Sequence, residues 1–314
     1  MMDVSVVIST HQVQRVGFTA DAVRSVLHQS LPPKEVIVAY DETPGLLQEL
    51  QKQLPPEAIL VLNDERRGLS AARITGARHA TAELVAFLDD DAEATPDWLR
   101  LMVPEFENPM VAGGGGRSIP QWLDAADRPW WFPEELDWVV GCHFEDWSRG
   151  RHFVRNVIGN NMIFRRDLLL KVGGFETRVG GAIAGDDTEI CLRVLQDNPR
   201  YLIFFQPEAL VHHKVPKARQ SVRYLMHSSW DQGSGKAVIR ALYPTQQEAL
   251  SSESSYLQDL ALRVVPRKLA GVVRGQWQNP VHLGVIGLSV ASVGWGFLTT
   301  KGRAQRMFKP RPMP

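Results

Sequence analysis

Two apolar runs decide the fold: VSVVIS at Val4–Ser9 and EVIVAY at Glu35–Tyr40. Both are rich in β-branched residues and nearly continuous, which is typical of strands buried on both faces of a parallel sheet. Segments with helical periodicity separate such runs. This alternation predicts an α/β fold, with a mostly parallel, Rossmann-like sheet flanked by helices. The expected strands are residues 4–9, 35–40, 58–62 and 84–88, and the expected helices are residues 19–29, 45–53 and 70–80.

Polar residues follow three of these strands: Thr10, Asp41 and Asp89–Asp91. Ligands of open parallel sheets bind at the carboxyl ends of the strands, so we expect these residues to share one cleft. In Asp89–Asp91, three adjacent carboxylates repel one another unless a cation lies between them. Oxygen ligands at this density favour Mg²⁺ or Mn²⁺ together with phosphate oxygens. The alternative is a solvated acidic turn that caps the next helix.

A second acidic segment, Gly185–Glu189 (GDDTE), opens an expected helix at Asp187–Gln196. Taken alone, Asp186 or Asp187 is more simply explained as the N-cap of that helix. A carboxylate beside a substrate hydroxyl can also act as the general base that a sugar or alcohol nucleophile requires. Because there are two aspartates, one can cap the helix while the other carries out catalysis.

Two further groups have alternative interpretations. His212 and His213 follow the apolar run Tyr201–Phe205. A single histidine near a core is more often structural than a metal ligand, but two in succession beside a triple-Asp cluster leave both roles open. Trp130, Trp131 and Trp138 either stack on a sugar or belong to the core.

Two glycine-rich segments do not match nucleotide-binding motifs. Gly113–Gly116 does not follow the first strand, as a dinucleotide fingerprint must, and we expect a mobile or tightly turned segment there. Gln232–Lys236 (QGSGK) lacks the first glycine and the Ser or Thr of a P-loop. We expect a flexible turn at this point of the otherwise helical residues 217–262.

Charge is distributed unevenly along the 314 residues. The chain has 35 basic and 35 acidic residues, but residues 260–314 contain nine basic residues and no acidic one. The first 259 residues therefore carry 26 basic and 35 acidic groups, a net charge of −9. The basic part contains the uncharged 20-residue segment Val281–Thr300, which fits a membrane span, a hydrophobic helical hairpin or an interfacial helix. We expect attachment to an anionic cytoplasmic membrane face. We expect no nucleic-acid partner, because no nucleic-acid-recognition motif accompanies the basic residues.

The two cysteines, Cys142 and Cys191, exclude a disulfide scaffold and a cysteine-based zinc module. They fit a reducing, cytoplasmic setting. No basic segment precedes the first apolar run, so we expect no signal peptide.

In this order, the segments resemble the family 2 inverting glycosyltransferases with the GT-A fold. The family's opening strand corresponds to Val4–Gln12, and its S-V-L-x-Q-x-x-P-x-E-V-I-V segment corresponds to Ser25–Val38. The resemblance covers about residues 3–215. Its other motifs are Gly68–Ile74 (GLSAARI), Asp89–Asp91, Gly159–Arg166 (GNNMIFRR), Val172–Phe175 (VGGF) and Gly185–Glu189 (GDDTE).

The resemblance implies that a UDP-sugar is the donor, that Asp187 is the catalytic base, and that Asp91 and His213, rather than His212, bind Mn²⁺ or Mg²⁺. Asp41 matches a uracil-contacting position. The implied nucleotide-sugar site is Thr10, Asp41, Arg73, Asp89 and Asp90, and the implied acceptor side is Trp131, Trp138 and Asp186. The implied domains are a GT-A transferase domain at residues 1–220, a helical extension at 221–262 and a membrane-associating helical tail at 263–314.

The chain departs from the family pattern at four positions. Tyr40 and Glu42 replace an Asp and a Gly of its V-D-D-G-S motif, which affects recognition of the base. Asp186 stands where Glu is usual, and Ile74 where Asn is usual. The metal-binding carboxylates and the base are retained.

The aromatic stretch Trp130–Cys142 resembles the glucosyl-dolichyl-phosphate glucuronosyltransferases of lipid-linked glycan assembly. This implies a glycan or polyprenyl-phosphate-linked acceptor. Two alternatives from other classes are a nucleotidyltransferase on the same type of sheet and a non-catalytic sugar-binding protein. A nucleotidyltransferase would need a Gly-rich basic loop where Ser9–Gly17 supplies one glycine and Arg15, and a protein without catalysis would not need all of the carboxylates.

Overall fold

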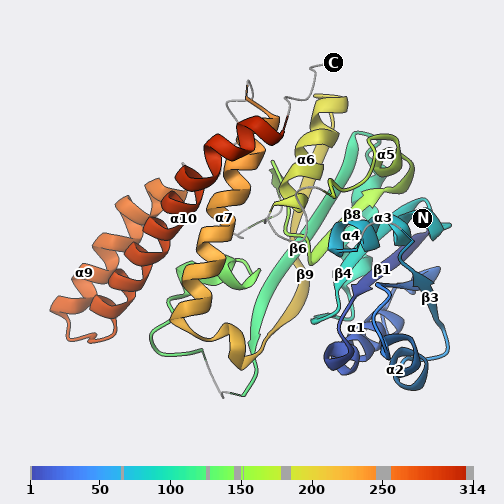
Figure 1. The fold of residues 1–314 in the computed structure, drawn as a ribbon, viewed down its shortest axis with the longest axis horizontal. Helices are drawn as coiled ribbons and strands as arrows, with labels where there is room; N and C mark the ends of the chain where they lie inside the picture. The colour runs from blue at the N-terminus through green and yellow to red at the C-terminus, as the bar shows by residue number, and fades with distance from the viewer. Residues whose placement is uncertain are drawn as a thin grey trace.

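The computed structural model describes residues 2–64, 67–124, 128–144, 150, 152–177, 185–244 and 256–308. They form a nine-stranded sheet with helices on both faces and a further group of helices to one side (Figure 1). The strands are β1 (Val4–Thr10), β2 (Glu35–Tyr40), β3 (Ala58–Leu62), β4 (Leu84–Asp89), β5 (Ala92–Ala94), β6 (Val111–Trp122), β7 (His152–Val154), β8 (Asn161–Arg165) and β9 (Leu202–Val215).

The α-helices are α1 (Val16–Leu27), α2 (Leu46–Gln53), α3 (Leu69–His79), α4 (Trp98–Met102), α5 (Arg166–Lys171), α6 (Asp186–Asp197), α7 (Val222–Leu242), α9 (Val265–Val273) and α10 (Asn279–Met307). The 3₁₀-helices are η1 (Val13–Arg15), η2 (Val103–Glu107), η3 (Glu134–Val140) and η5 (Lys217–Arg219), and η7 (Leu260–Val264) is a π-helical turn.

The sheet has the order β3-β2-β1-β4-β8-β6-β9-β5, and β7 pairs with β9. The first four of these strands run parallel, and β6 runs parallel to β9. Among the described strands, antiparallel pairing is confined to pairs that include β5, β7 or β8. The predicted α/β fold is confirmed, and the seven strands and helices expected before residue 90 form within three residues of their predicted bounds.

Each face of the sheet has its own apolar core. Val6 and Ile8 of β1 pack into the core beneath α1, α2 and α4. Val7, between them, packs with Phe87 on the opposite face, beneath α3, α5 and α6. Because successive strand residues point to opposite faces, a strand covered on both sides needs apolar residues at consecutive positions. This requirement explains the VSVVIS run, and it aligns β1, β2 and β4 so that their carboxyl ends meet at one edge.

The prediction of a mobile or turned segment at Gly113–Gly116 is wrong, because these residues lie within β6. Aromatic rings occupy the space that side chains would need there. A Cβ on Gly113 would lie 2.3 Å from the ring of Phe164, and a Cβ on Gly114 would lie 2.3 Å from the ring of Phe204. The glycines are therefore packing positions in a central strand.

The turn expected at Gln232–Lys236 is also wrong, because this segment lies inside α7. Here the glycines bring two helices together. A Cβ on Gly233 would lie 2.0 Å from the backbone oxygen of Val293 in α10, and a Cβ on Gly296 would lie 2.1 Å from that of Trp230 in α7. Small residues at these positions let the backbones of α7 and α10 approach closely.

The uncharged segment Val281–Thr300 lies within the single helix α10, which excludes the hairpin interpretation for this segment. Among the described helices, α10 is the one long and apolar enough to cross a membrane, with a mean hydropathy of 1.7 over an 18-residue window. It packs along α7, and α9 lies beside it in the opposite direction (Figure 1).

Candidate functional site

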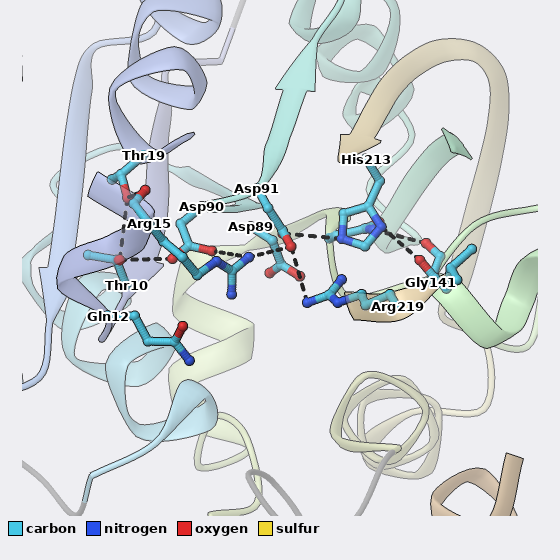
Figure 2. Close-up of polar contacts among 12 residues, drawn as sticks. Thr10, Gln12, Arg15, Thr19, Asp89, Asp90, Asp91, Gly141, His213 and Arg219 are labelled. Atoms are coloured by element: carbon cyan, nitrogen blue, oxygen red, sulfur yellow. Dashed lines mark hydrogen bonds and ion pairs between the residues drawn. The ribbon is translucent and has the colours of Figure 1, made fainter. Parts of the chain in front are cut away.

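The acidic turn and the second histidine meet because a short strand joins them. β4 ends at Asp89, Asp90 and Asp91 form the turn, and β5 then pairs antiparallel with β9. This register sets Ala92 opposite His213. As a result, ligand atoms of Asp89, Asp91 and His213 all lie within 4.8 Å of one another (Figure 2).

His213 is oriented for metal binding through Nε2. Its Nδ1 lies 2.8 Å from the carbonyl oxygen of Val140, which can only accept, so Nδ1 carries the hydrogen. Its Nε2 lies 3.1 Å from Oδ1 of Asp91. Burial opposes protonation of His213, but the Asp91 carboxylate outweighs burial and raises the pKa well above its ordinary value. A metal ion would replace that proton on Nε2.

His212 is not part of this cluster among the described residues. It is the residue before His213 in β9 and is paired with Glu93, so its side chain points to the other face of the sheet. Two successive histidines therefore have different environments, and His213 is the one beside the acidic turn.

Two arginines flank the acidic turn. Arg15 forms ion pairs with Asp90, at 2.7 Å, and with Asp91, while Nη2 of Arg219 lies 3.2 Å from Oδ2 of Asp91 (Figure 2). Burial raises the pKa of Asp90 to about 7, although Arg15 opposes this effect. Burial also acts on Asp91, but His213 and the two arginines outweigh it, and the pKa of Asp91 is lowered. Sequence reasoning assigned no role to either arginine.

A buried guanidinium links the two acidic segments. Arg73 of α3 donates to Oδ1 of Asp89 at 2.8 Å and to Oδ2 of Asp186 at 3.1 Å. It also donates to the carbonyl oxygen of Gly159 at 2.9 Å. Only 3% of Arg73 is exposed, so its charge is balanced by carboxylates rather than by water.

The two aspartates at the start of α6 differ in their partners. Asp186 accepts from the Ser70 hydroxyl at 2.9 Å as well as from Arg73. Asp187 accepts from the backbone N–H groups of Gly159, at 3.1 Å, and Thr188, at 2.6 Å. Burial, and then the charge of Asp186, raise the pKa of Asp187. Gly185 is the N-cap residue, so neither aspartate occupies that position.

These groups line one cavity of about 740 Å³. Its walls come from the ends of β1 and β4, from η3, from the start of α6 and from one face of α7. The residues predicted for the site that line it are Arg73, Asp89, Asp90, Asp91, Trp138, Asp186, Asp187 and His213.

Three residues predicted for the site, Thr10, Asp41 and Trp131, are not among the described residues that line the cavity. Thr10 donates to Asp90 at 2.8 Å. Asp41 accepts from the amide of Asn63 at 2.6 Å and from the backbone N–H of Gly68 at 3.1 Å. Trp131 packs against Phe132, with the ring centroids 5.6 Å apart. Trp138, by contrast, lines the cavity and donates to the Tyr256 hydroxyl at 3.0 Å.

Some residues that line the cavity were not predicted from the sequence. Tyr224, Ser228, Gln232 and Lys236 are spaced four residues apart on α7, so they form one polar stripe facing the cavity. The buried hydroxyl of Ser9 also lines the cavity and has no hydrogen-bond partner among the described residues. Four-residue spacing within the predicted helical region was the one available clue to the stripe.

Comparisons with known proteins agree with this architecture. The model of the family described as Glycosyl transferase family 2 matches residues 5–173. A glucosyl-dolichyl phosphate glucuronosyltransferase of Haloferax volcanii is 33% identical over 305 residues, which cover 95% of this chain and 96% of that protein. The succinoglycan biosynthesis protein ExoM of Rhizobium meliloti is 28% identical over 164 residues, covering 50% of this chain and 48% of that protein.

Two solved structures share the fold. The mannosyltransferase PcManGT of Pyrobaculum calidifontis, in complex with GDP-Man and Mn²⁺, superposes with a TM-score of 0.57 at 19% identity, covering 98% of this chain and 83% of that one. GalNAc-T7 with UDP, GalNAc and Mn²⁺ gives a TM-score of 0.50 at 18% identity, covering 82% and 54%. These similarities confirm the predicted GT-A architecture.

Proposed function

The chain belongs to glycosyl transferase family 2, and on that basis we propose that it moves a sugar from a UDP-sugar to a hydroxyl group of a glycan or polyprenyl-phosphate-linked acceptor, with inversion at the anomeric carbon. As a glycosyltransferase it needs a site for a nucleotide-sugar and a base for the acceptor hydroxyl. Family membership argues against the nucleotidyltransferase and the non-catalytic alternatives.

The observation that carries the proposal is the convergence of Asp89, Asp91 and His213 in one cavity with Asp187. A suitable ligand set for Mn²⁺ or Mg²⁺ is two carboxylates and one imidazole. The Nδ1–H of His213 already donates to the carbonyl oxygen of Val140, which orients Nε2 for the metal. When bound, such an ion supplies positive charge for the leaving diphosphate. Arg15 and Arg219 add positive charge on either side of Asp91.

We assign the base to Asp187. Its neighbour Asp186 is paired with Arg73, whereas the contacts described for Asp187 are backbone N–H groups, which hold its carboxylate in place. In the transfer, the acceptor oxygen forms a bond to the anomeric carbon as its proton passes to Asp187. The bond from that carbon to the diphosphate oxygen breaks, and its electron pair leaves with UDP.

For the nucleotide, the proposal uses the residues at the carboxyl ends of β1, β2 and β4. Asp41 would recognise the base, and Asp89 would face the ribose or the sugar. Thr10 would act through Asp90, to which it donates, and the hydroxyl of Ser9, which has no hydrogen-bond partner among the described residues, would lie beside the ligand. On the acceptor side we place Trp138 and Asp186, which line the cavity, and Trp131, which packs against Phe132 and the apolar cluster that includes η3.

The acceptor assignment rests on the relative named a glucosyl-dolichyl phosphate glucuronosyltransferase, which matches nearly the whole chain. A lipid-linked acceptor requires the cavity to lie near a membrane. We therefore propose that the protein acts at the cytoplasmic face of the cell membrane, with residues 1–220 as the catalytic domain, 221–262 as a helical extension and 263–314 as the membrane-associating part.

A donor panel tests this function. Purified protein is incubated with Mn²⁺ and individual UDP-sugars or GDP-mannose, with and without polyprenyl-phosphate-linked glycans, and release of the nucleoside diphosphate is measured. The proposal predicts acceptor-dependent UDP release with one class of UDP-sugar and a product of inverted configuration. Turnover of GDP-mannose alone would contradict the UDP assignment, and retained configuration would contradict the mechanism.

A further inference from the structure

The outward faces of α9 and α10 form an apolar surface beside a helix that lines the cavity. The large apolar residues on it are Leu269 and Val273 of α9, Trp277 of the connecting turn, and Leu288, Trp295 and Leu298 of α10; we call them the hairpin surface. Each is half exposed or more, from 50% for Leu288 to 89% for Val273. Large apolar surfaces of this kind mark sites of protein or membrane interaction.

The hairpin surface is continuous along the outer side of α10. Leu288, Trp295 and Leu298 are separated by seven and three residues, so they lie on one face of the helix. Residues 279–300 carry no formally charged side chain. The other face packs on the protein through Val285, Ile286 and Ser289. α10 is thus apolar on the side that the protein does not cover.

The inner face of α10 is joined to α7 along most of its length. Ser289 and Ser229 share a hydrogen bond of 2.8 Å, and Ser292 donates to the carbonyl oxygen of Met226 at 2.7 Å. Further along, Thr300 donates to the Ser234 hydroxyl at 3.0 Å. α7 cannot enter the hydrocarbon core with α10, because it carries charged residues and its opposite face lines the cavity.

Basic side chains border the hairpin surface. Arg274 lies in the turn before α10, near the beginning of that helix. Lys301 lies in the last part of α10, three residues after Leu298, so it is next to Leu298 on the helix surface. Both are exposed, as are Arg303 and Arg306. With no acidic residue after position 259, the charge complements an anionic lipid surface rather than a basic or neutral partner. Exposed Trp277 and Trp295 are of the type that favours the interface between water and hydrocarbon.

We propose that α9 and α10 lie in the plane of an anionic lipid surface, with the hairpin surface in the headgroup region, and that α10 does not cross the bilayer. This inference rests on the membrane partner of the proposed function and specifies its geometry. α10 and α7 then lie between the lipid and the cavity, which puts the cavity about 20 Å from the lipid at about 10 Å for each helix. A lipid-linked acceptor can reach Asp187 around or along α7 while its chain stays in the membrane.

Vesicle binding and depth-dependent quenching test the proposal on the full chain. Vesicles of phosphatidylcholine, with and without phosphatidylglycerol, are sedimented with the protein. We expect binding that requires phosphatidylglycerol, and at least about ten-fold weaker binding for the triple variant Leu288→Gln, Trp295→Gln, Leu298→Gln. The matched control, Ile59→Gln with Met110→Gln, removes exposed apolar residues elsewhere and should bind normally.

The depth of Trp295 is measured with lipids brominated either near the headgroup or near the end of the acyl chain, which quench tryptophan fluorescence. The quenching of Trp295 is the difference between the wild-type chain and Trp295→Phe. In-plane binding predicts stronger quenching by the shallow bromines. Stronger quenching by the deep bromines would overturn the proposal in favour of a span, since Trp295 lies near the middle of α10. If sedimentation velocity showed that the wild-type chain is a dimer and the triple variant a monomer, the hairpin surface would instead bind a second copy of this chain, and the proposal would be overturned.

UDP release with a water-soluble acceptor separates this inference from the proposed function. The triple variant should keep that activity while it loses vesicle binding. If UDP release is intact, but wild-type binding does not require phosphatidylglycerol or the triple variant still binds vesicles normally, only the proposal for the hairpin surface is refuted. Intact vesicle binding with no transferase activity on any donor would refute only the proposed function.

Discussion

Arg73 of α3 donates to Asp186 of α6 at 3.1 Å, and this contact joins residues 113 positions apart in the sequence. The same guanidinium donates to Asp89 at 2.8 Å. One buried cation therefore fixes the distance between the proposed metal site and the start of the helix that carries the proposed base. The carboxylates raise the pKa of Arg73 further although burial opposes this, so the residue stays charged.

Replacing Arg73 should therefore destabilise the protein as well as inactivate it. Arg73→Ala leaves two partly buried carboxylates without their buried partner, and we expect a loss of about 3 kcal/mol in the free energy of unfolding. Urea denaturation followed by circular dichroism measures the change. Arg100→Ala removes an arginine from an exposed pair with Asp97 and should change stability little. Equal stabilities for the two variants would contradict the linking role.

Asp187→Asn should lower kcat by about 10²–10⁴-fold, because the acceptor hydroxyl loses its general base. Affinity for UDP should stay nearly unchanged, because the asparagine has the shape of the aspartate. Isothermal titration calorimetry with UDP and Mn²⁺, together with the UDP-release assay, separates the two effects. A parallel loss of UDP affinity and turnover would contradict the assignment of the base.

Removing the metal should abolish turnover, and the two histidines should respond differently. We expect EDTA to stop UDP release and added Mn²⁺ or Mg²⁺ to restore it. His213→Gln should weaken Mn²⁺ binding, measured by electron paramagnetic resonance of free Mn²⁺, by about 10–100-fold or more. His212→Gln is the matched control and should bind Mn²⁺ normally, since His212 points to the other face of the sheet. Equal effects of the two substitutions would contradict the proposed ligand set.

Gly114 should not tolerate a side chain, although its local sequence resembles a loop. In Gly114→Ala the new Cβ would lie 2.3 Å from the ring of Phe204, and we expect overpacking to cost about 1–3 kcal/mol. Gly17→Ala has no atom within 4 Å of the new Cβ and should be neutral or slightly stabilising. Thermal unfolding of both variants checks this, and a stable Gly114→Ala would contradict the tight packing of β6.

The sequence predicted the parts of the molecule whose structure is decided locally. Apolar runs predicted β1, β2, β3 and β4, and repulsion within Asp89–Asp91 pointed to a cation at the end of β4. The conformation of Gly113–Gly116 is not decided locally and was predicted wrongly, because it depends on the rings of Phe164 and Phe204 in the neighbouring strands. Likewise, nothing within the sequence around Gln232–Lys236 predicts that α10 packs there.

Arg15 and Arg219 could not be placed from sequence for a related reason. The apolar pattern predicts that β1 forms, but nothing in the sequence predicts that η1 and η5 bring these arginines to the same carboxylate. The sequence left His212 and His213 as two candidate ligands. Adjacent strand residues point to opposite faces, so only one of the two histidines can face Asp91. The pairing of β5 with β9 determines that it is His213, and the sequence alone does not predict this pairing.

The pH dependence of catalysis should report the environment of Asp187. Burial and the charge of Asp186 raise the pKa of Asp187 above its ordinary value of 3.8. A general base works in its deprotonated form, so kcat/KM should rise with pH through this raised pKa, and the acid limb should lie above pH 3.8. In Asp186→Asn the neighbouring negative charge is gone and Arg73 is less neutralised, so the limb should move to lower pH. Profiles of kcat/KM measured at saturating Mn²⁺ test this; a limb that stays in place or moves to higher pH would show that another group limits the rate.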